Sequence, residues 1–142
     1  MKIDGQCFCG HVTYEAEINP KHVAICYCTD CQRHSGSAYS VAVAVAPDKF
    51  RLTAGTLKSV DRIADSGTRR AMTFCPECGT RIYGMVLDNP AASFTIRIGT
   101  VNQRADLEPK SQVWCSSRMP WVKLIEGIPA HARNFVPSAS RP

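Results

Sequence analysis

The sequence predicts a mainly β fold of folded antiparallel sheets that are pinned together by zinc knuckles. Two observations lead to this prediction. Short apolar runs with alternating or β-branched character recur along the chain, whereas apolar residues at helical spacing are scarce. Eight cysteines lie mostly in closely spaced groups. In a cytosolic chain such groups indicate metal binding sooner than a disulfide framework.

The composition is typical of one globular domain. The chain has 142 residues, of which 44% are hydrophobic, enough for a real core. No stretch approaches the ~20 apolar residues of a membrane span, and the first six residues have no signal-peptide core. We therefore expect a cytoplasmic protein with no membrane partner. A single domain is expected over residues 1–135, with a loose tail over residues 136–142, where Ala, Ser, Pro and Arg dominate.

The charge pattern argues against a nucleic-acid partner. The net charge is +5, but the seventeen Lys and Arg residues are spread along the chain and form no basic block. A mildly basic surface favours a small anionic ligand equally well. Nothing in the sequence indicates a particular oligomeric state.

The expected elements of the first half follow from local patterns. Residues 11–18 alternate polar and apolar side chains, which is the period of a half-buried strand. Residues 23–26 form a short apolar run, and residues 28–36 are polar and favour a helical turn. Residues 39–46 are rich in Val and Ala and end at Pro47, so they predict a strand.

The second half of the chain continues in the same way. Residues 50–53 and 57–60 flank an Ala-Gly-Thr turn and predict a β-hairpin. No internal repeat is evident. Further strands are expected over residues 70–74, 81–86, 93–98 and 112–115.

The first group of cysteines predicts a structural zinc site. Cys75 and Cys78 are two residues apart and a glycine follows them, as in a zinc knuckle whose amides face the sulfurs. One knuckle provides two of the four ligands that structural zinc needs. Cys7 and Cys9, also followed by a glycine, are the natural other half. The alternative is that these four are free core cysteines.

The second group, Cys26, Cys28 and Cys31, predicts a reactive zinc site. Three protein ligands and one open position are the arrangement of a catalytic zinc. Three thiolates make the metal a weak Lewis acid, better suited to binding an incoming thiol as thiolate than to activating water. The alternative is a site closed by a fourth protein ligand, for which His34 and Cys115 are the candidates.

Several motifs together resemble a known family. They occur in a fixed order between about Gly5 and Pro129, and they are specific only in combination. In this combination the chain resembles the glutathione-dependent formaldehyde-activating enzyme family, which also includes centromere protein V. The matching pieces are Gly5-x-Cys7-x-Cys9-Gly10-x-Val12-x-Tyr14, Cys26-x-Cys28-x2-Cys31-Gln32-Arg33-x2-Gly36-Ser37-x-Tyr39, Phe74-Cys75-x2-Cys78-Gly79-Thr80-x2-Tyr83, Ile98-Gly99-Thr100, Val113-Trp114 and Pro120-Trp121.

The resemblance implies an enzyme with two zincs per chain. It places the structural zinc on the four-cysteine group and the catalytic zinc on the three-cysteine group. The implied reaction adds the thiol of glutathione to formaldehyde and is classed as a carbon–sulfur lyase reaction because the reverse direction cleaves that bond. The family often has a histidine where this chain has Gln112. Partners expected for the glutathione carboxylates are Arg33, Ser35, Gly36 and Ser37.

Two other function classes stay open at this point. One is a non-catalytic zinc module that binds a protein or nucleic-acid partner, as centromere protein V suggests. The other is a redox sensor in which the three-cysteine group oxidises and releases metal. An exchangeable fourth ligand on the second metal favours the enzyme, two closed sites favour the module, and metal loss under mild peroxide favours the sensor.

Overall fold

Ten β-strands form the framework of the part of the chain that the computed structural model describes, residues 1–64 and 66–134. One helix, α1 (Thr29–Ser35), and five short 3-10 helices connect them. The strands are β1 (Lys2–Gln6), β2 (Thr13–Glu17), β3 (Val23–Cys26), β4 (Ser40–Val45), β5 (Phe50–Ala54), β6 (Lys58–Ile63), β7 (Arg69–Phe74), β8 (Arg81–Val86), β9 (Phe94–Arg97) and β10 (Ser111–Val113). The 3-10 helices are Pro20–His22, Pro47–Lys49, Ile98–Thr100, Arg104–Asp106 and Cys115–Ser117.

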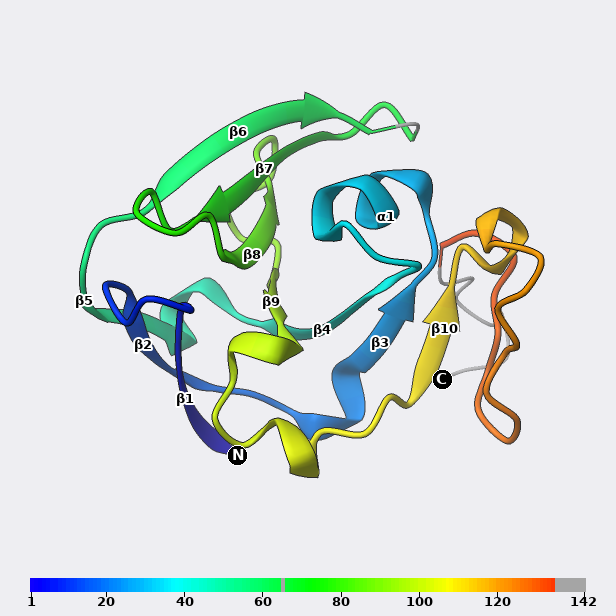
Figure 1. The fold of residues 1–142 in the computed structure, drawn as a ribbon, viewed down its shortest axis with the longest axis horizontal. Coiled ribbons are helices and arrows are strands. Elements are labelled where there is room, and N and C mark those ends of the chain that lie inside the picture. Colours follow the sequence, from blue (N-terminus) through cyan, green and yellow to red (C-terminus); the bar gives the residue numbers. More distant parts are fainter. Residues whose placement is uncertain (65, 135–142) are drawn as a thin grey trace.

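The strands form two sheets, and this confirms the predicted fold class. The smaller sheet has the order β1-β2-β5 and the larger one the order β10-β3-β4-β9-β8-β7-β6. Every pair of these strands is antiparallel except β10 and β3, which are parallel. Figure 1 shows the larger sheet following a curve from β10 to β6, with α1 inside the curve. No helix of the described residues is long and apolar enough to cross a membrane.

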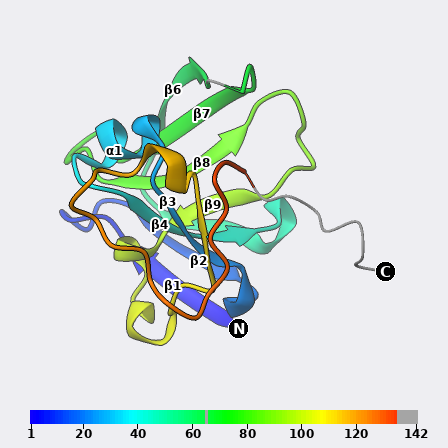
Figure 2. The ribbon, with the colours of Figure 1, turned by 90° about the vertical axis from the view of Figure 1, so that its right-hand side faces the viewer.

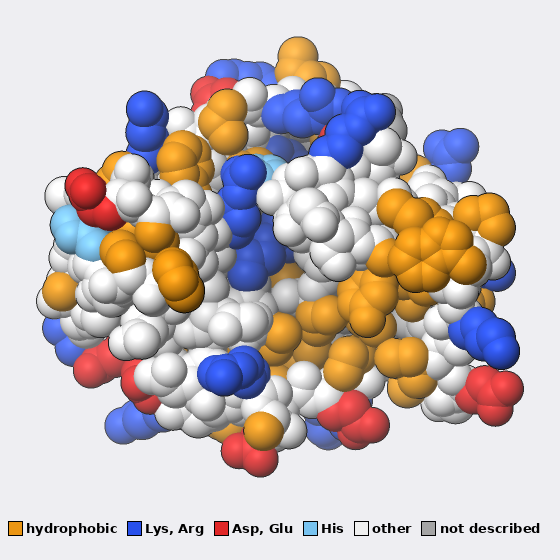
Figure 3. Space-filling view, in the orientation of Figure 1, with side chains coloured by type: hydrophobic (Ala, Val, Ile, Leu, Met, Phe, Trp, Pro, Cys, Tyr) orange, Lys and Arg blue, Asp and Glu red, His pale blue; other side chains and the backbone are white. Residues whose placement is uncertain are grey.

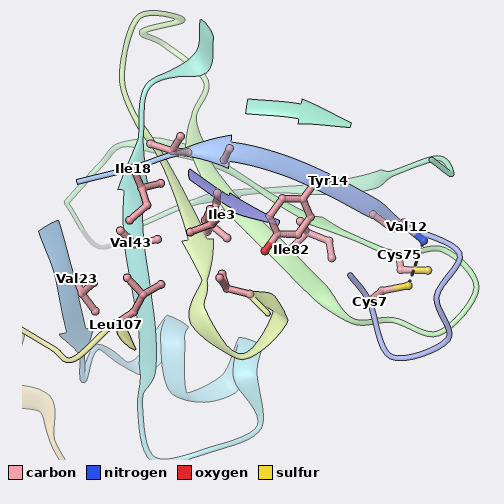
Figure 4. Close-up of a cluster of buried hydrophobic side chains, with 14 residues drawn as sticks. Ile3, Cys7, Val12, Tyr14, Ile18, Val23, Val43, Cys75, Ile82 and Leu107 are labelled. Atoms are coloured by element: carbon pink, nitrogen blue, oxygen red, sulfur yellow. Dashed lines mark hydrogen bonds between the residues drawn. The ribbon is translucent and has the colours of Figure 1, made fainter. Parts of the chain in front are cut away.

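The core lies where the smaller sheet packs on the larger one. Alternate residues of β1, β2, β4 and β8 point into it, as the period-two pattern requires (Figure 4). Each fully buried aliphatic side chain there contributes about 1.5–3 kcal/mol through the hydrophobic effect. The hydroxyl of Thr100 donates its only proton to the carbonyl of Arg97 at 2.8 Å. Its oxygen can therefore only accept from the hydroxyl of Tyr14, which lies 2.7 Å away.

A second, smaller core lies beneath the segment that follows β10. It contains Ile25, Tyr27, Cys115 and Val122. Residues 129–133 then run beside β10 and exchange backbone hydrogen bonds with it. Figure 2 shows this segment covering that side of the molecule. The tail expected over residues 136–142 lies outside the described residues.

One expectation about strands was wrong, and one strand was missed. Residues 50–53 and 57–60 do not form a hairpin, because β5 pairs with β2 in the smaller sheet and β6 pairs with β7 in the larger one. The chain changes sheets at Gly55, whose positive φ of 85° and close approach to the His11 carbonyl leave no room for a side chain. Strand β1 was not expected, because only Ile3 and a glycine occupy its buried positions.

Replacing Gly5 by alanine should lower the free energy of unfolding by about 2–3 kcal/mol. A methyl group at this position would overlap the carbonyl oxygen of Thr100 and the ring of Tyr14, and the backbone oxygen has little freedom to move. Urea denaturation measures the effect. Gly99→Ala is the matched control, since nothing lies within 4 Å of the methyl group it adds. Equal stability of the two variants would contradict the packing described for β1.

Candidate metal centres and the cavities beside them

The Sγ atoms of Cys7, Cys9, Cys75 and Cys78 all lie within 4.8 Å of one another. The sulfur–sulfur distance is 3.6 Å between Cys7 and Cys9 and 3.9 Å between Cys9 and Cys75. A tetrahedral zinc with Zn–S bonds of about 2.3 Å separates its sulfurs by about 3.8 Å. All four cysteines are free thiols. The donor set and its spacing therefore fit a closed zinc site.

Two turns from different sheets bring these four sulfurs together. Cys7 and Cys9 lie in the turn between β1 and β2, where the backbone N–H of Val12 donates to Cys7 Sγ at 3.2 Å. Cys75 and Cys78 lie in the turn between β7 and β8. Figure 4 shows the side chains of Cys7 and Cys75 next to each other at the edge of the core. A metal here would join the smaller sheet to the larger one.

The surroundings of this cluster separate the pKa values of its thiols. Hydrogen bonds from the Thr80 hydroxyl and backbone lower the pKa of Cys78 to about 5. The backbone of His11 lowers the pKa of Cys9, but burial and the neighbouring thiols outweigh it and raise that pKa to about 12. The cluster thus favours one thiolate that accepts hydrogen bonds from neighbouring protonated thiols. A divalent metal can bind these sulfurs in place of the thiol protons.

The sulfurs of Cys26, Cys28 and Cys31 form a second group within 4.8 Å of one another. Cys26 ends β3, Cys28 caps the N-terminus of α1 and Cys31 lies in its first turn. The backbone N–H of Cys31 donates to Cys28 Sγ at 3.3 Å. Within the described residues neither His34 nor Cys115 belongs to this group. Cys115 is instead buried in the smaller core.

Negative charge in this second group gathers on one sulfur. Hydrogen bonds from Cys26 and then Cys28 lower the pKa of Cys31 to about 2, and the guanidinium of Arg97 and the hydroxyl of Ser40 act in the same direction. Hydrogen bonds with Cys28 and then with Cys31 raise the pKa of Cys26. Three sulfurs with a cation beside one of them fit a three-ligand zinc site.

A cavity of about 590 Å³ opens beside Cys31. This volume is in the range of small-molecule sites, which is about 300–1,000 Å³. Three arginines, Arg81, Arg97 and Arg104, line it, and we name it the cationic cavity. Figure 3 shows Lys and Arg side chains lying in the hollow at the middle of one face.

His34 also lines the cationic cavity, and it is held neutral. Its pKa is lowered by burial and by the charge of Arg81. The Arg81 guanidinium lies 2.9 Å from His34 Nε2, and because a guanidinium can only donate, Nε2 accepts and the proton is on Nδ1. Nδ1 is buried without a hydrogen-bond partner among the described residues.

The structure places the four expected carboxylate partners at the end of α1. Of these, Ser35 lines the cationic cavity, whereas Arg33, Gly36 and Ser37 are exposed and are not among its lining residues. Gly36 ends the helix in the left-handed conformation, with φ 65°.

The arginines of the cationic cavity were missed at the sequence level. Arg81 and Arg97 lie on strands whose alternate residues are buried, where a basic residue normally marks the solvent face. Their nearness in sequence to the cysteine knuckle and to the Ile98-Gly99-Thr100 motif was the available signal.

Gln112 has a structural role in this fold. It is fully buried, and its Oε1 accepts from the Tyr27 hydroxyl at 2.8 Å and from the backbone N–H of Ile125 at 2.8 Å. Its Nε2 donates to the Ile125 carbonyl at 3.0 Å. The side chain therefore fastens the segment after β10 to β3, and it is not part of either cysteine group.

Comparisons with known proteins agree with this geometry. A relative from Pyrenophora teres f. teres (strain 0-1), described as a putative glutathione-dependent formaldehyde-activating enzyme, is 28% identical over 91 residues, which is 61% of this chain and 47% of that protein. The chain thus matches about half the length of this relative. A crystal structure of a Rhodobacter sphaeroides protein has the same fold, with a TM-score of 0.58 and 23% identity over 75% of this chain and 96% of that one. The family model described as glutathione-dependent formaldehyde-activating enzyme matches residues 2–117, and the chain therefore belongs to that family.

Proposed function

We propose that this protein is a zinc-dependent carbon–sulfur lyase. It joins the thiol of glutathione, or of a similar small thiol, to formaldehyde or a related electrophile. The sulfur bonds to the carbonyl carbon, the thiol proton passes to the carbonyl oxygen, and the reverse reaction breaks the same bond. One observation carries the proposal: Cys31 of the three-cysteine group lies in the wall of a cavity that three arginines line. A thiol-reactive centre and a surface for an anionic thiol therefore meet at one place.

Two zincs per chain form part of the proposal. The residues Cys7, Cys9, Cys75 and Cys78 would hold a structural zinc, and Cys26, Cys28 and Cys31 would hold the other. When bound, the second zinc would lower the pKa of an incoming thiol so that it reacts as a thiolate. The sulfur-only donor sets and their spacing support this assignment.

The arginines of the cationic cavity would bind and orient glutathione. This tripeptide carries two carboxylates and one ammonium at neutral pH, so it has a net negative charge. Arginine binds carboxylates through paired, charge-assisted hydrogen bonds. Arg97 also donates to Ser40 Oγ at 3.2 Å and lies beside Cys31, where a cation stabilises charge that develops on a carbonyl oxygen.

Metal analysis followed by a glutathione titration of cobalt-substituted protein tests this function. We expect two metals per chain and a change in the cobalt absorption when glutathione is added, because the open position takes the thiol. Two metals with no spectral change would indicate two closed sites and a non-catalytic module. Loss of one metal under mild peroxide, without any response to glutathione, would instead indicate a redox sensor.

Replacing Arg81 by glutamine should weaken glutathione binding about tenfold, because one charge-assisted hydrogen bond to a carboxylate is lost. Binding of 2-mercaptoethanol, which has no carboxylate, should not change. Isothermal titration of both thiols measures the difference. Arg69→Gln is the control, since Arg69 is exposed, pairs with Asp88 at 3.5 Å and does not line the cavity. An equal loss of affinity for both thiols would show that Arg81 does not bind the carboxylates.

The cytoplasmic location and the single domain over residues 1–135 belong to the same proposal. Thiols that hold metal must stay reduced, and the cytosol keeps them so. All eight cysteines are free in the structure, which supports this location. Localisation of a tagged chain by cell fractionation would test it.

A further inference from the structure

A second cavity, of about 370 Å³, opens on the three-cysteine group. It lies between α1, β3 and β4 on one side and β7, β8 and residues of the turn before β7 on the other, and Cys26, Cys28 and Cys31 all line it. An ion pair of 2.8 Å between Asp30 of α1 and Arg62 of β6 holds the helix to the far edge of the larger sheet. We name this space the apolar cavity.

Small side chains on one face of the larger sheet create the apolar cavity. Ala24 of β3 is paired with Ala42 of β4, and Ala42 is paired with Arg97 of β9. Ala44, two residues further along β4, points to the same face and is paired with Thr95. These residues line the cavity floor, and Met72, Val86 and Trp114 add apolar side chains to its wall. Polar side chains, among them Asp30 and Arg70, line the rest.

The two cavities meet at the cysteine group. Cys31, Ser40 and Arg97 line both of them. Cys31 therefore borders both a larger space that Arg81 and Arg104 line and a smaller space with alanines on its floor. A reaction that joins an anionic molecule to an apolar one at Cys31 can place one substrate in each of these two spaces.

The size of the apolar cavity bears on the second substrate. Formaldehyde has two heavy atoms, and a water molecule takes about 30 Å³ in the liquid, so formaldehyde needs a small fraction of such a space. A volume of about 370 Å³ is within the range of sites for molecules of several heavy atoms. An apolar wall gives hydrophobic binding energy only to a substrate that has an apolar group to bury.

We propose that the apolar cavity binds the carbonyl substrate, and that this substrate is an aldehyde with an apolar substituent larger than hydrogen. This inference rests on the proposed function. The thiol binds in the cationic cavity, and its sulfur bonds to the aldehyde carbon. The carbon–oxygen double bond becomes a single bond, and the thiol proton passes to that oxygen. The product is a thiohemiacetal, with no oxidant or reductant involved.

The experiment measures glutathione addition to formaldehyde, propanal, 3-methylbutanal and benzaldehyde by NMR exchange spectroscopy on the zinc-loaded protein. The rate without protein is subtracted from each. We expect the protein-dependent exchange rate with 3-methylbutanal or benzaldehyde to equal or exceed the rate with formaldehyde. Turnover of formaldehyde alone would overturn this inference and leave the proposed function standing. No acceleration with any aldehyde would overturn both.

Two variants connect the result to the cavity. Ala42→Leu fills the floor, so the ratio of the 3-methylbutanal rate to the formaldehyde rate should fall at least tenfold. Val86→Ala enlarges the wall without filling it, so the same ratio should stay or rise, which keeps the test informative if Ala42→Leu folds poorly. Ala54→Leu is the matched control, because Ala54 is an exposed strand alanine that lines neither cavity. An unchanged or raised ratio in Ala42→Leu, or a lowered ratio in Val86→Ala, would overturn the inference.

Discussion

Replacing Cys75 by serine should remove one metal per chain and lower the free energy of unfolding by about 4–5 kcal/mol. Loss of a structural metal belongs to the few single changes with so large an effect, since metal-binding free energy is also folding free energy. Cys75 is fully buried, and its cluster joins the turn between β1 and β2 to the turn between β7 and β8. On the proposed function a metal at this cluster joins the smaller sheet to the larger one, and the variant would lose that connection. Urea denaturation and metal analysis measure the two effects.

Cys115→Ala is the matched control for this variant. Cys115 is also buried, but it belongs to the smaller core and to neither cysteine group. Its replacement removes one sulfur from an apolar contact and should cost about 1 kcal/mol, with both metals retained. Two metals per chain in Cys75→Ser would contradict the structural site.

Replacing Cys31 by serine should leave one metal per chain and slow glutathione addition at least about a hundredfold. In the part of the chain that the structure describes, no other side chain is placed to replace Cys31 as a ligand. Cys115 is buried in the smaller core, and His34 Nε2 already accepts a hydrogen bond from Arg81. A neutral hydroxyl is a poor ligand in place of a thiolate, so the second metal should be lost while the structural metal stays. Metal analysis and NMR exchange with formaldehyde measure both consequences.

The stability of Cys31→Ser separates a chemical effect from unfolding. Cys31 lies on α1, outside the larger core, so the midpoint of urea unfolding should change far less than in Cys75→Ser. Cys115→Ala again serves as control and should keep the full exchange rate. A Cys31→Ser protein that retains two metals and normal exchange would show that this cluster is not the reactive centre.

Local patterns in the sequence were sufficient to find most of the strands. The alternation in residues 11–18 and the Val/Ala run of residues 39–46 correspond to β2 and β4, and the polar stretch after Cys28 forms α1. The cysteine pairs were equally readable. Two cysteines separated by one or two residues lie on the same turn, because only the residues between them determine the geometry of a knuckle.

The assignment of strands to sheets needed the tertiary structure. Residues 50–53 and 57–60 have the composition of a hairpin, yet β5 pairs with β2 and β6 pairs with β7. Long-range pairing of this kind leaves no trace in a local pattern. The parallel pairing of β10 with β3 is a second example.

The sequence alone was thus enough to identify the sulfur ligands available for metal, the short spacings that place neighbouring cysteines on one turn, and the β character of the fold. The tertiary structure decided that Cys7 and Cys75 meet, that Cys115 stays apart from the three-cysteine group, and that Arg81 and Arg97 face one cavity. The difference comes from how far apart in the sequence the interacting residues lie. A turn fixes side chains a few residues apart, whereas a cavity depends on which strands become neighbours, and that is settled by burial of the whole core.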